Sequence, residues 1–230
     1  MIYERFRHHS IHHQSTNPPL HIVSITYIII GFTCLISFMA FQNPDITVKM
    51  KHWPFYEKRD GEYYRWLTSG FLHGDTMHLL FNMLALFLFG AGLEEWFDEQ
   101  FAGAGKTLFV VFYVAAIVAA SSATYYRYRD TAGFASIGAS GAVAAVMFAD
   151  ILIDPLMTLR FLLFPVPIKG FIFGILYLWY SSYAAKQGRD NIDHTAHFYG
   201  AVFGFFFPLV LDPSLFPSFL SKVQGWIQSF

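Results

Sequence analysis

The stretch TMHLLFNMLALFLFGAGL at residues 76–93 decides the fold class, because it runs for 18 residues without a charge between Asp75 and Glu94. A helix needs about 20 mostly apolar residues to cross a hydrocarbon layer of about 30 Å. Five further windows are bounded by charges or polar turns, at residues 21–41, 107–126, 131–149, 170–185 (extendable backwards through the apolar residues 161–168) and 194–211. Buried helices of a soluble protein would carry polar faces that these windows lack, so the pattern predicts six transmembrane helices.

The composition of the chain agrees with a membrane protein. Hydrophobic residues make up 55% of the 230 residues and charged residues 13%, whereas an average globular domain carries about 25% charged residues. The 15 Lys and Arg residues nearly balance the 16 Asp and Glu residues, so there is no basic excess to bind nucleic acid. The single cysteine, Cys34, excludes an internal disulfide framework and a zinc site built from cysteines, and we expect no cofactor.

We divide the chain into a polar N-terminal tail (residues 1–20), a membrane domain (21–211) and a C-terminal tail (212–230). Within the membrane domain, the long aromatic connection at 42–75 predicts a folded loop at the level of the lipid headgroups. The N-terminal tail holds four histidines that we expect to be solvated rather than metal-bound, namely His8, His9, His12 and His13. The C-terminal tail predicts a helix lying on the membrane through one apolar stripe, Phe219, Val223, Trp226, Ile227 and Phe230.

Polar side chains inside the windows are few, and such residues are functional candidates by default. Ser140 lies in the sequence Gly138-Ala139-Ser140-Gly141, at the start of the fourth predicted helix, and His197 lies near the start of the sixth. A serine hydroxyl becomes a useful nucleophile only when a neighbouring base accepts its proton. His197 is the obvious base, provided that the two helices approach closely.

Small residues supply a reason for that approach. Gly200 and Gly204 follow His197 on roughly the same helix face, and Gly141 and Ala145 offer a matching surface on the fourth helix. In lipid, small residues let helix backbones come close and gain van der Waals contact. Packing alone would explain the glycines, but it would not require a serine on one helix and a histidine on the other.

Acyl transfer also needs donors for an oxyanion. His78 and Asn82 lie four residues apart on one face of the second helix, with His73 just before them. These side chains could donate to an oxyanion together with the backbone N–H of Ser140 at its helix N-terminus, or they could form a hydrogen bond between helices. Asp193 is expected to cap the sixth helix, which leaves a Ser–His dyad rather than a triad.

From residue 21 to residue 212, the chain resembles the rhomboid family of intramembrane serine proteases. Four features match in chain order: the long first loop, His73…His78-x-x-x-Asn82, Gly138-Ala139-Ser140-Gly141 and Ala196-His197-x-x-Gly200-x-x-x-Gly204. The resemblance implies an all-α bundle of six transmembrane helices with a long interfacial first loop. It implies that Ser140 is the nucleophile, that His197 is the general base and then the acid, and that His78, Asn82 and the Ser140 amide hold the oxyanion. The matching residues in supporting positions are His73, Gly138, Gly141, Gly200, Gly204 and Arg65. Substrates would be membrane-anchored proteins, cut in or near a transmembrane segment.

The sequence departs from the family pattern at two places. Arg65 follows Tyr64 and precedes Trp66, whereas the first loop of the family usually carries a Trp-Arg pair. Ala144 stands where the family often places an aromatic ring against the catalytic histidine, so Phe148 or Tyr199 would have to substitute.

The resemblance also implies a cytoplasmic N-terminus. In that orientation the cytoplasmic segments hold six Lys and Arg residues and the outside loops hold nine. This distribution is opposite to the excess of Lys and Arg that cytoplasmic loops usually carry. We nevertheless expect a cytoplasmic N-terminus, because the Lys and Arg rule is derived from short loops and the first loop here is long and folded.

Two other functions are compatible with a six-helix membrane protein. A catalytically weak or inactive relative would bind membrane clients without cutting them, although such relatives typically lose the serine or the histidine. A transporter or channel would usually show intramembrane charges and paired broken helices. The small chain, without evident added domains or a signal peptide, suggests the plasma membrane of a bacterium.

Overall fold

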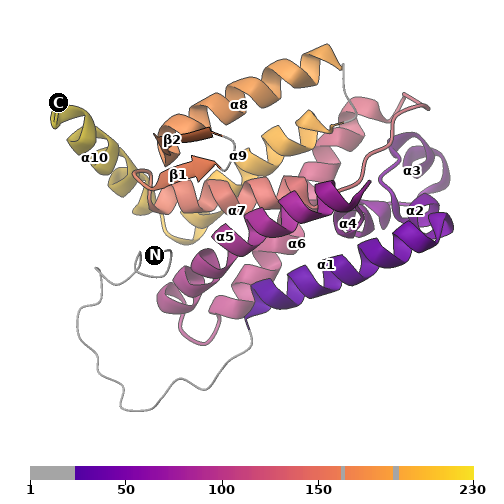
Figure 1. Ribbon diagram of the computed structural model, residues 1–230, viewed down its shortest axis with the longest axis horizontal. Helices are drawn as coiled ribbons and strands as arrows, with labels where there is room; N and C mark the ends of the chain where they lie inside the picture. The colour runs from indigo at the N-terminus through magenta and orange to yellow at the C-terminus, as the bar shows by residue number, and fades with distance from the viewer. Residues whose placement is uncertain (1–23, 162–163, 189–191) are drawn as a thin grey trace.

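The computed structural model describes residues 24–161, 164–188 and 192–230, and most of these are helical (Figure 1). The predicted N-terminal tail at 1–20, with its four histidines, lies outside this range. The elements in chain order are α1 (Ile25–Gln42), α2 (Pro44–Met50), α3 (Pro54–Asp60), α4 (Arg65–Thr68), a short 3₁₀ helix (Ser69–Phe71), α5 (Thr76–Gln100), α6 (Gly105–Tyr128), α7 (Ser140–Ile153), β1 (Thr158–Phe161), β2 (Phe164–Lys169), α8 (Gly170–Gln187), α9 (His194–Leu211) and α10 (Leu215–Gln228).

Each of the six uncharged windows contains one long helix. Within the described residues, four helices are long and apolar enough to cross a membrane, namely α1, α5, α6 and α9. The remaining two windows hold α7, with 14 residues, and α8, with 18. The predicted class, a helical membrane bundle, is therefore confirmed, while the number of six crossings stays a prediction.

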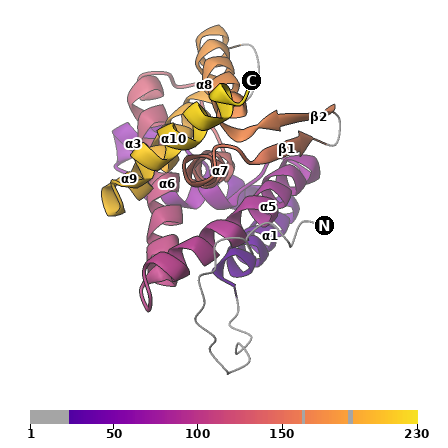
Figure 2. The ribbon, with the colours of Figure 1, turned by 90° about the vertical axis from the view of Figure 1, so that its left-hand side faces the viewer.

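Helix α7 occupies the middle of the bundle, and Figure 2 shows it nearly end-on with the other helices around it. Its buried residues lie on every side of the helix and are mostly small or branched, which lets neighbouring helices approach from all directions. At 1.5 Å per residue, its 14 residues span about 21 Å. A hydrocarbon layer is about 30 Å thick, so α7 is too short to cross it along the membrane normal.

Two parts of the predicted helices are wrong. The fourth uncharged window begins at residue 131, but α7 begins only at Ser140, so the window is too long while the expected place of Ser140 at the helix start is confirmed. Ser136, in the preceding segment, instead exchanges backbone hydrogen bonds with His52 of the first loop, at 3.0 and 2.9 Å. The absence of charges indicates apolar character but does not determine backbone conformation. Gly138 in this segment has a left-handed φ of 136°, which a right-handed helix does not contain.

The second error concerns residues 161–168, which were expected to extend the fifth helix backwards. Strands β1 and β2 form an antiparallel hairpin there, with Thr158 paired to Lys169 and Leu159 paired to Ile168. Pro165 and Pro167 explain the difference, because proline lacks the amide hydrogen that a helix interior requires.

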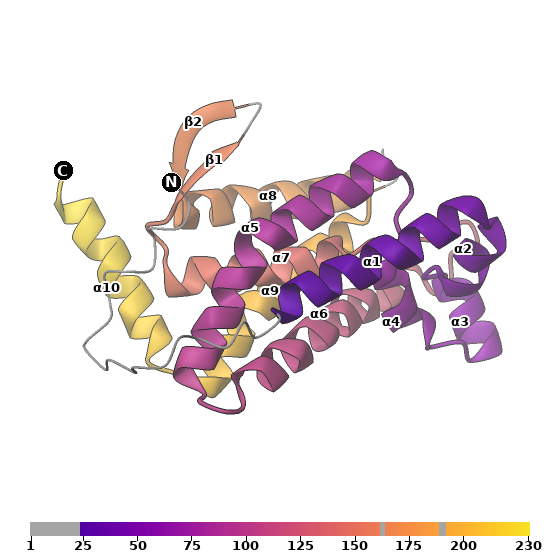
Figure 3. The same ribbon diagram turned by 60° about the horizontal axis from the view of Figure 1, so that its bottom comes forward.

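The first loop is folded, as its aromatic composition predicts. Buried Glu57 organises it by accepting hydrogen bonds from the His52 ring (2.7 Å), the Trp53 amide (2.7 Å) and the Trp66 indole (2.9 Å). Arg65 donates to the carbonyl oxygen of Val48 at 2.7 Å. Figure 3 shows the helices of this loop at one end of the molecule and α10 at the other.

The apolar stripe of the C-terminal helix is partly used for packing. Phe219 contacts Phe205 of α9 and Trp226 contacts Phe171 of α8, both with ring centroids 5.5 Å apart. Phe230 at the end of the stripe is 92% exposed. The stripe therefore docks α10 on the bundle, and its location on the membrane stays a prediction.

Candidate active site

The contact between α7 and α9 brings the start of one helix to the start of the other. A methyl group at Gly200 would overlap the carbonyl oxygen of Gly141, and one at Gly204 would overlap the backbone of Ala145. The two backbones therefore touch, which is the close approach that the small residues predict. Ser140 is the first residue of α7, and His197 lies in the first turn of α9.

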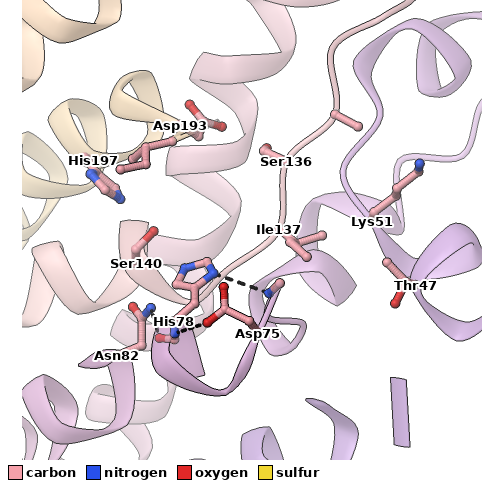
Figure 4. Close-up of a pocket in the computed structure, with 13 residues that line it drawn as sticks. Thr47, Lys51, Asp75, His78, Asn82, Ser136, Ile137, Ser140, Asp193 and His197 are labelled. Atoms are coloured by element: carbon pink, nitrogen blue, oxygen red, sulfur yellow. Dashed lines mark hydrogen bonds between the residues drawn. The ribbon is translucent and has the colours of Figure 1, made fainter. Parts of the chain in front are cut away.

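A cavity of about 720 Å³ opens at this junction, and it is lined by all four residues singled out from the sequence: Ser140, His197, His78 and Asn82. The Ser140 side chain points into it, with the rings of His197 and His78 on either side in the view of Figure 4. Thr47 and Lys51 of the first loop and residues 135–137 form further parts of the wall. Helices α2, α5, α7 and α9 and the segments that precede α5, α7 and α9 thus contribute to one pocket.

Gly138 lies between the His78 ring and the Ser140 hydroxyl. A Cβ atom at this position would stand 3.0 Å from Nε2 of His78 and 3.6 Å from Oγ of Ser140. Its φ of 136° is in the region that residues with side chains rarely adopt. A glycine is therefore required both for the turn into α7 and for the space between the two side chains.

The N-terminus of α7 carries no side-chain cap in the described structure. The first backbone N–H groups of a helix have no partner within the helix, and the helix dipole adds partial positive charge there. Because Ser140 occupies this end, the pocket offers backbone donors to a negatively charged oxygen.

The tautomer of His78 follows from its neighbours. The Gly74 amide donates to Nδ1 of His78 at 3.4 Å (Figure 4). A neutral ring that accepts at Nδ1 carries its hydrogen on Nε2, which is the atom that faces Gly138. Asn82 donates to the carbonyl oxygen of His78 at 2.9 Å through Nδ2, and this amide nitrogen carries a second hydrogen.

The ring of His197 is supported by aromatic neighbours that the sequence did not indicate. Tyr177 of α8 lies with its ring centroid 6.3 Å from that of His197 and 31° from parallel, and His194 meets the same ring edge-on at 5.7 Å. Phe148 packs against Tyr177 at 5.5 Å. The aromatic ring missing at Ala144 is thus supplied by Tyr177, whereas Tyr199 is 50% exposed. In the sequence, Tyr177 could have been noticed only as a polar group within the apolar window 170–185.

Asp193 caps α9, as expected. Its carboxylate accepts hydrogen bonds from the Ala196 amide at 2.9 Å and from the Thr124 hydroxyl at 2.9 Å. This carboxylate also contributes to the pocket wall. Its hydrogen bonds tie the start of α9 to α6.

His73 and Arg65 stand behind the pocket rather than in its lining. Nδ1 of His73 lies 2.9 Å from the Ser37 hydroxyl, and the ring packs edge-on against His78 at 4.9 Å. Burial, reinforced by the nearby His78, lowers the pKa of His73 to about 3, so its ring is neutral. Arg65 donates to the carbonyl oxygen of Lys51 at 3.2 Å. Burial, together with the Arg65 charge, lowers the pKa of the Lys51 ammonium at the pocket wall.

The fold and the pocket define a class: a multi-pass membrane protein whose central short helix presents a serine beside a histidine. No group of three or more His, Cys, Asp or Glu residues in the described part of the chain could hold a metal ion. Residues 60–213 match the family model described as the Rhomboid domain. The chain therefore belongs to the rhomboid family.

Curated relatives come from plants and bacteria. RHOMBOID-like protein 12, mitochondrial, of Arabidopsis thaliana is 33% identical over 151 residues, covering 62% of this chain and 45% of that protein. Rhomboid protease GlpG of Haemophilus influenzae is 30% identical over 122 residues, covering 52% and 58%. Rhomboid protease AarA of Providencia stuartii is 29% identical over 103 residues, covering 40% and 34%. The chain spans about half the length of the curated relatives it matches.

Proposed function

We propose that the protein is an intramembrane serine endopeptidase that cleaves membrane-anchored proteins in or near a transmembrane segment. The observation that carries the proposal is the single cavity lined by Ser140, His197, His78 and Asn82. Membership of a family that includes proteins named rhomboid proteases supports it further. A cavity of about 720 Å³ beside Ser140 has room for the water that hydrolysis consumes.

In the proposed reaction, His197 accepts the proton of the Ser140 hydroxyl while Oγ attacks the carbonyl carbon of the scissile peptide bond. The developing oxyanion accepts hydrogen bonds from the Ser140 amide, from Nε2–H of His78 and from Nδ2–H of Asn82. His197 then donates its proton to the leaving amine. A water molecule, deprotonated by the same ring, attacks the acyl-enzyme and releases the second product.

The short central helix supports the intramembrane character of the reaction. Because α7 spans about 21 Å, a serine at its N-terminus can lie below the membrane surface, where a spanning substrate passes. The relatives come from both plants and bacteria, and one is named as mitochondrial, so they leave the predicted bacterial plasma membrane unsupported. The proposal therefore extends to an integral membrane protein and not to a particular membrane.

Cleavage of a single-span substrate tests the proposal. The full chain in liposomes receives a fluorescently labelled substrate that contains small residues in an easily unwound stretch. We expect cleavage by the parent and by the control Ser182→Ala, with a rate at least about 10⁴-fold lower in Ser140→Ala and His197→Ala. Equal cleavage by Ser140→Ala would refute the mechanism. Substrate binding by the parent without cleavage would favour a client-binding relative.

A further inference from the structure

A second cavity, of about 560 Å³, lies away from the catalytic pocket, between the β1–β2 hairpin, α8 and α10. These elements meet at the end of the molecule opposite to the helices of the first loop (Figures 1 and 3). The proposed protease mechanism uses none of the residues that line it.

One wall of this cavity is cationic. Along β1, Leu159 is buried in the core while its neighbours Thr158 and Arg160 are exposed, as alternation along a strand requires. Lys169 faces Thr158 across the hairpin, and its Nζ donates to the carbonyl oxygen of Leu156 at 3.0 Å and to the hydroxyl of Thr158 at 3.1 Å. Arg160 and Lys169 both line the cavity, and no carboxylate is among its described lining residues.

The other wall is apolar and continues into exposed apolar surface on α8. Ile172 and Leu176, one turn apart on α8, line the cavity together with Trp226 of α10. Leu176 is 50% exposed, and the exposed surface of α8 continues through Ile175 and Trp179. Trp226 is held edge-on against Phe171. Indole rings are enriched at the boundary between headgroups and acyl chains.

We propose that this cavity binds one anionic phospholipid of the adjacent bilayer leaflet. The phosphate group accepts charge-assisted hydrogen bonds from Arg160 and from the remaining Nζ hydrogen of Lys169. The indole of Trp226 packs against the glycerol region, and an acyl chain lies along Ile172 and Leu176. Basic pockets between membrane helices bind acidic headgroups in this manner. The site does not depend on the catalytic function.

Native mass spectrometry of the detergent-purified full chain tests the proposal. The protein is offered phosphatidylglycerol and phosphatidylcholine of equal chain length at equal concentration. We expect one retained phosphatidylglycerol per protein. Two basic side chains favour the anionic lipid by roughly 30-fold, and this preference is lost in the double variant Arg160→Gln/Lys169→Gln.

A matched double variant, Lys49→Gln/Lys186→Gln, removes the same charge at exposed positions outside the cavity and is expected to keep the preference. If the preference for phosphatidylglycerol falls equally in both double variants, the preference depends on net charge alone and the proposed site is contradicted. Equal retention of both lipids by the parent, which requires no variant to fold, would also overturn it. Soluble glycerol phosphate at the same concentration is expected to bind far more weakly, and equal binding would show that the ligand is a free phosphate and not a lipid.

Discussion

Gly138 illustrates how a single residue shapes the pocket. The turn that leads into α7 requires a left-handed φ of 136°, and the absence of a side chain leaves room for the His78 ring beside the Ser140 hydroxyl. Ser140, His197, His78 and Asn82 could be chosen from the sequence because polar groups are rare within apolar windows. Tyr177 could not be chosen, since its role depends on a contact with His197 on another helix. The Gly74 amide could not be chosen, since its role depends on the path of the backbone turn before His78.

Substituting Gly138 tests this reading. We expect Gly138→Ala to lower the cleavage rate at least about 10²-fold, because the added methyl group meets the His78 ring and the backbone strain costs about 1–3 kcal/mol. Gly133→Ala is the matched control, since nothing lies within 4 Å of a methyl group there. Cleavage assays and thermal unfolding of both variants provide the measurement. An active Gly138→Ala variant would contradict the placement of His78 as an oxyanion donor.

Tyr177 is expected to act as a positioning residue for His197. Removing its ring in Tyr177→Ala should lower kcat about tenfold with little change in KM, because the histidine loses a packing partner and not a substrate contact. Tyr177→Phe keeps the ring and should retain near-parental kcat. Tyr183→Ala, on the same helix and exposed, serves as control. Equal kcat values for all of these proteins would show that the ring contact has no role.

The buried His73 predicts a loss of stability in acid. Its pKa falls from about 6.5 to about 3 on folding, so between these values the unfolded chain binds a proton that the folded protein does not. The free energy of unfolding therefore decreases as the pH falls from about 6.5 towards 3, and it is unaffected by this group above that interval. Thermal midpoints across this range should decline less steeply in His73→Gln. Parallel declines would argue against a neutral buried ring.

At the scale of the element, the docking of α7 against α9 determines where the two reactive side chains meet. The sequence predicted this contact from the spacing of small residues on both helices, because such residues let helix backbones approach closely in lipid. The hairpin that precedes α8 was not predicted, since the uncharged windows measured hydropathy and gave the prolines at 165 and 167 no weight. The uncharged window alone also missed the late start of α7, which the position of Ser140 after Gly138 had indicated.

The α7–α9 contact predicts a steep cost for a larger residue in α9. Gly204→Ala places a methyl group in the backbone of Ala145, so the helices must separate, at a cost of about 1–3 kcal/mol. Both stability and cleavage should fall. Gly31→Ala in α1, where the added methyl group meets nothing within 4 Å, should leave both unchanged. Thermal unfolding in detergent and the cleavage assay compare the two. A Gly204→Ala variant with parental stability would contradict the backbone contact.

At the scale of the whole molecule, the short α7 lies inside a bundle of longer helices, and the folded first loop lies beside its N-terminal end. This arrangement places a pocket with polar side chains beside the N-terminus of α7, while many large apolar side chains lie exposed on the outer helices. The described part of the hairpin, the start of α8 and α10 gather at the other end, where the proposed lipid site lies. The catalytic pocket and the proposed lipid site share no lining residue, so a negative result for one site does not contradict the other.

The central claim is that His197 activates the hydroxyl of Ser140 inside the membrane. The most direct measurement is the rate of covalent labelling by a fluorophosphonate, with the modified residue located by mass spectrometry, in the parent and in His197→Ala embedded in liposomes. We expect labelling of the parent at Ser140 and a labelling rate at least about 10²-fold lower in His197→Ala. Equal rates in the two proteins, or labelling of the parent at another residue, would contradict the central claim.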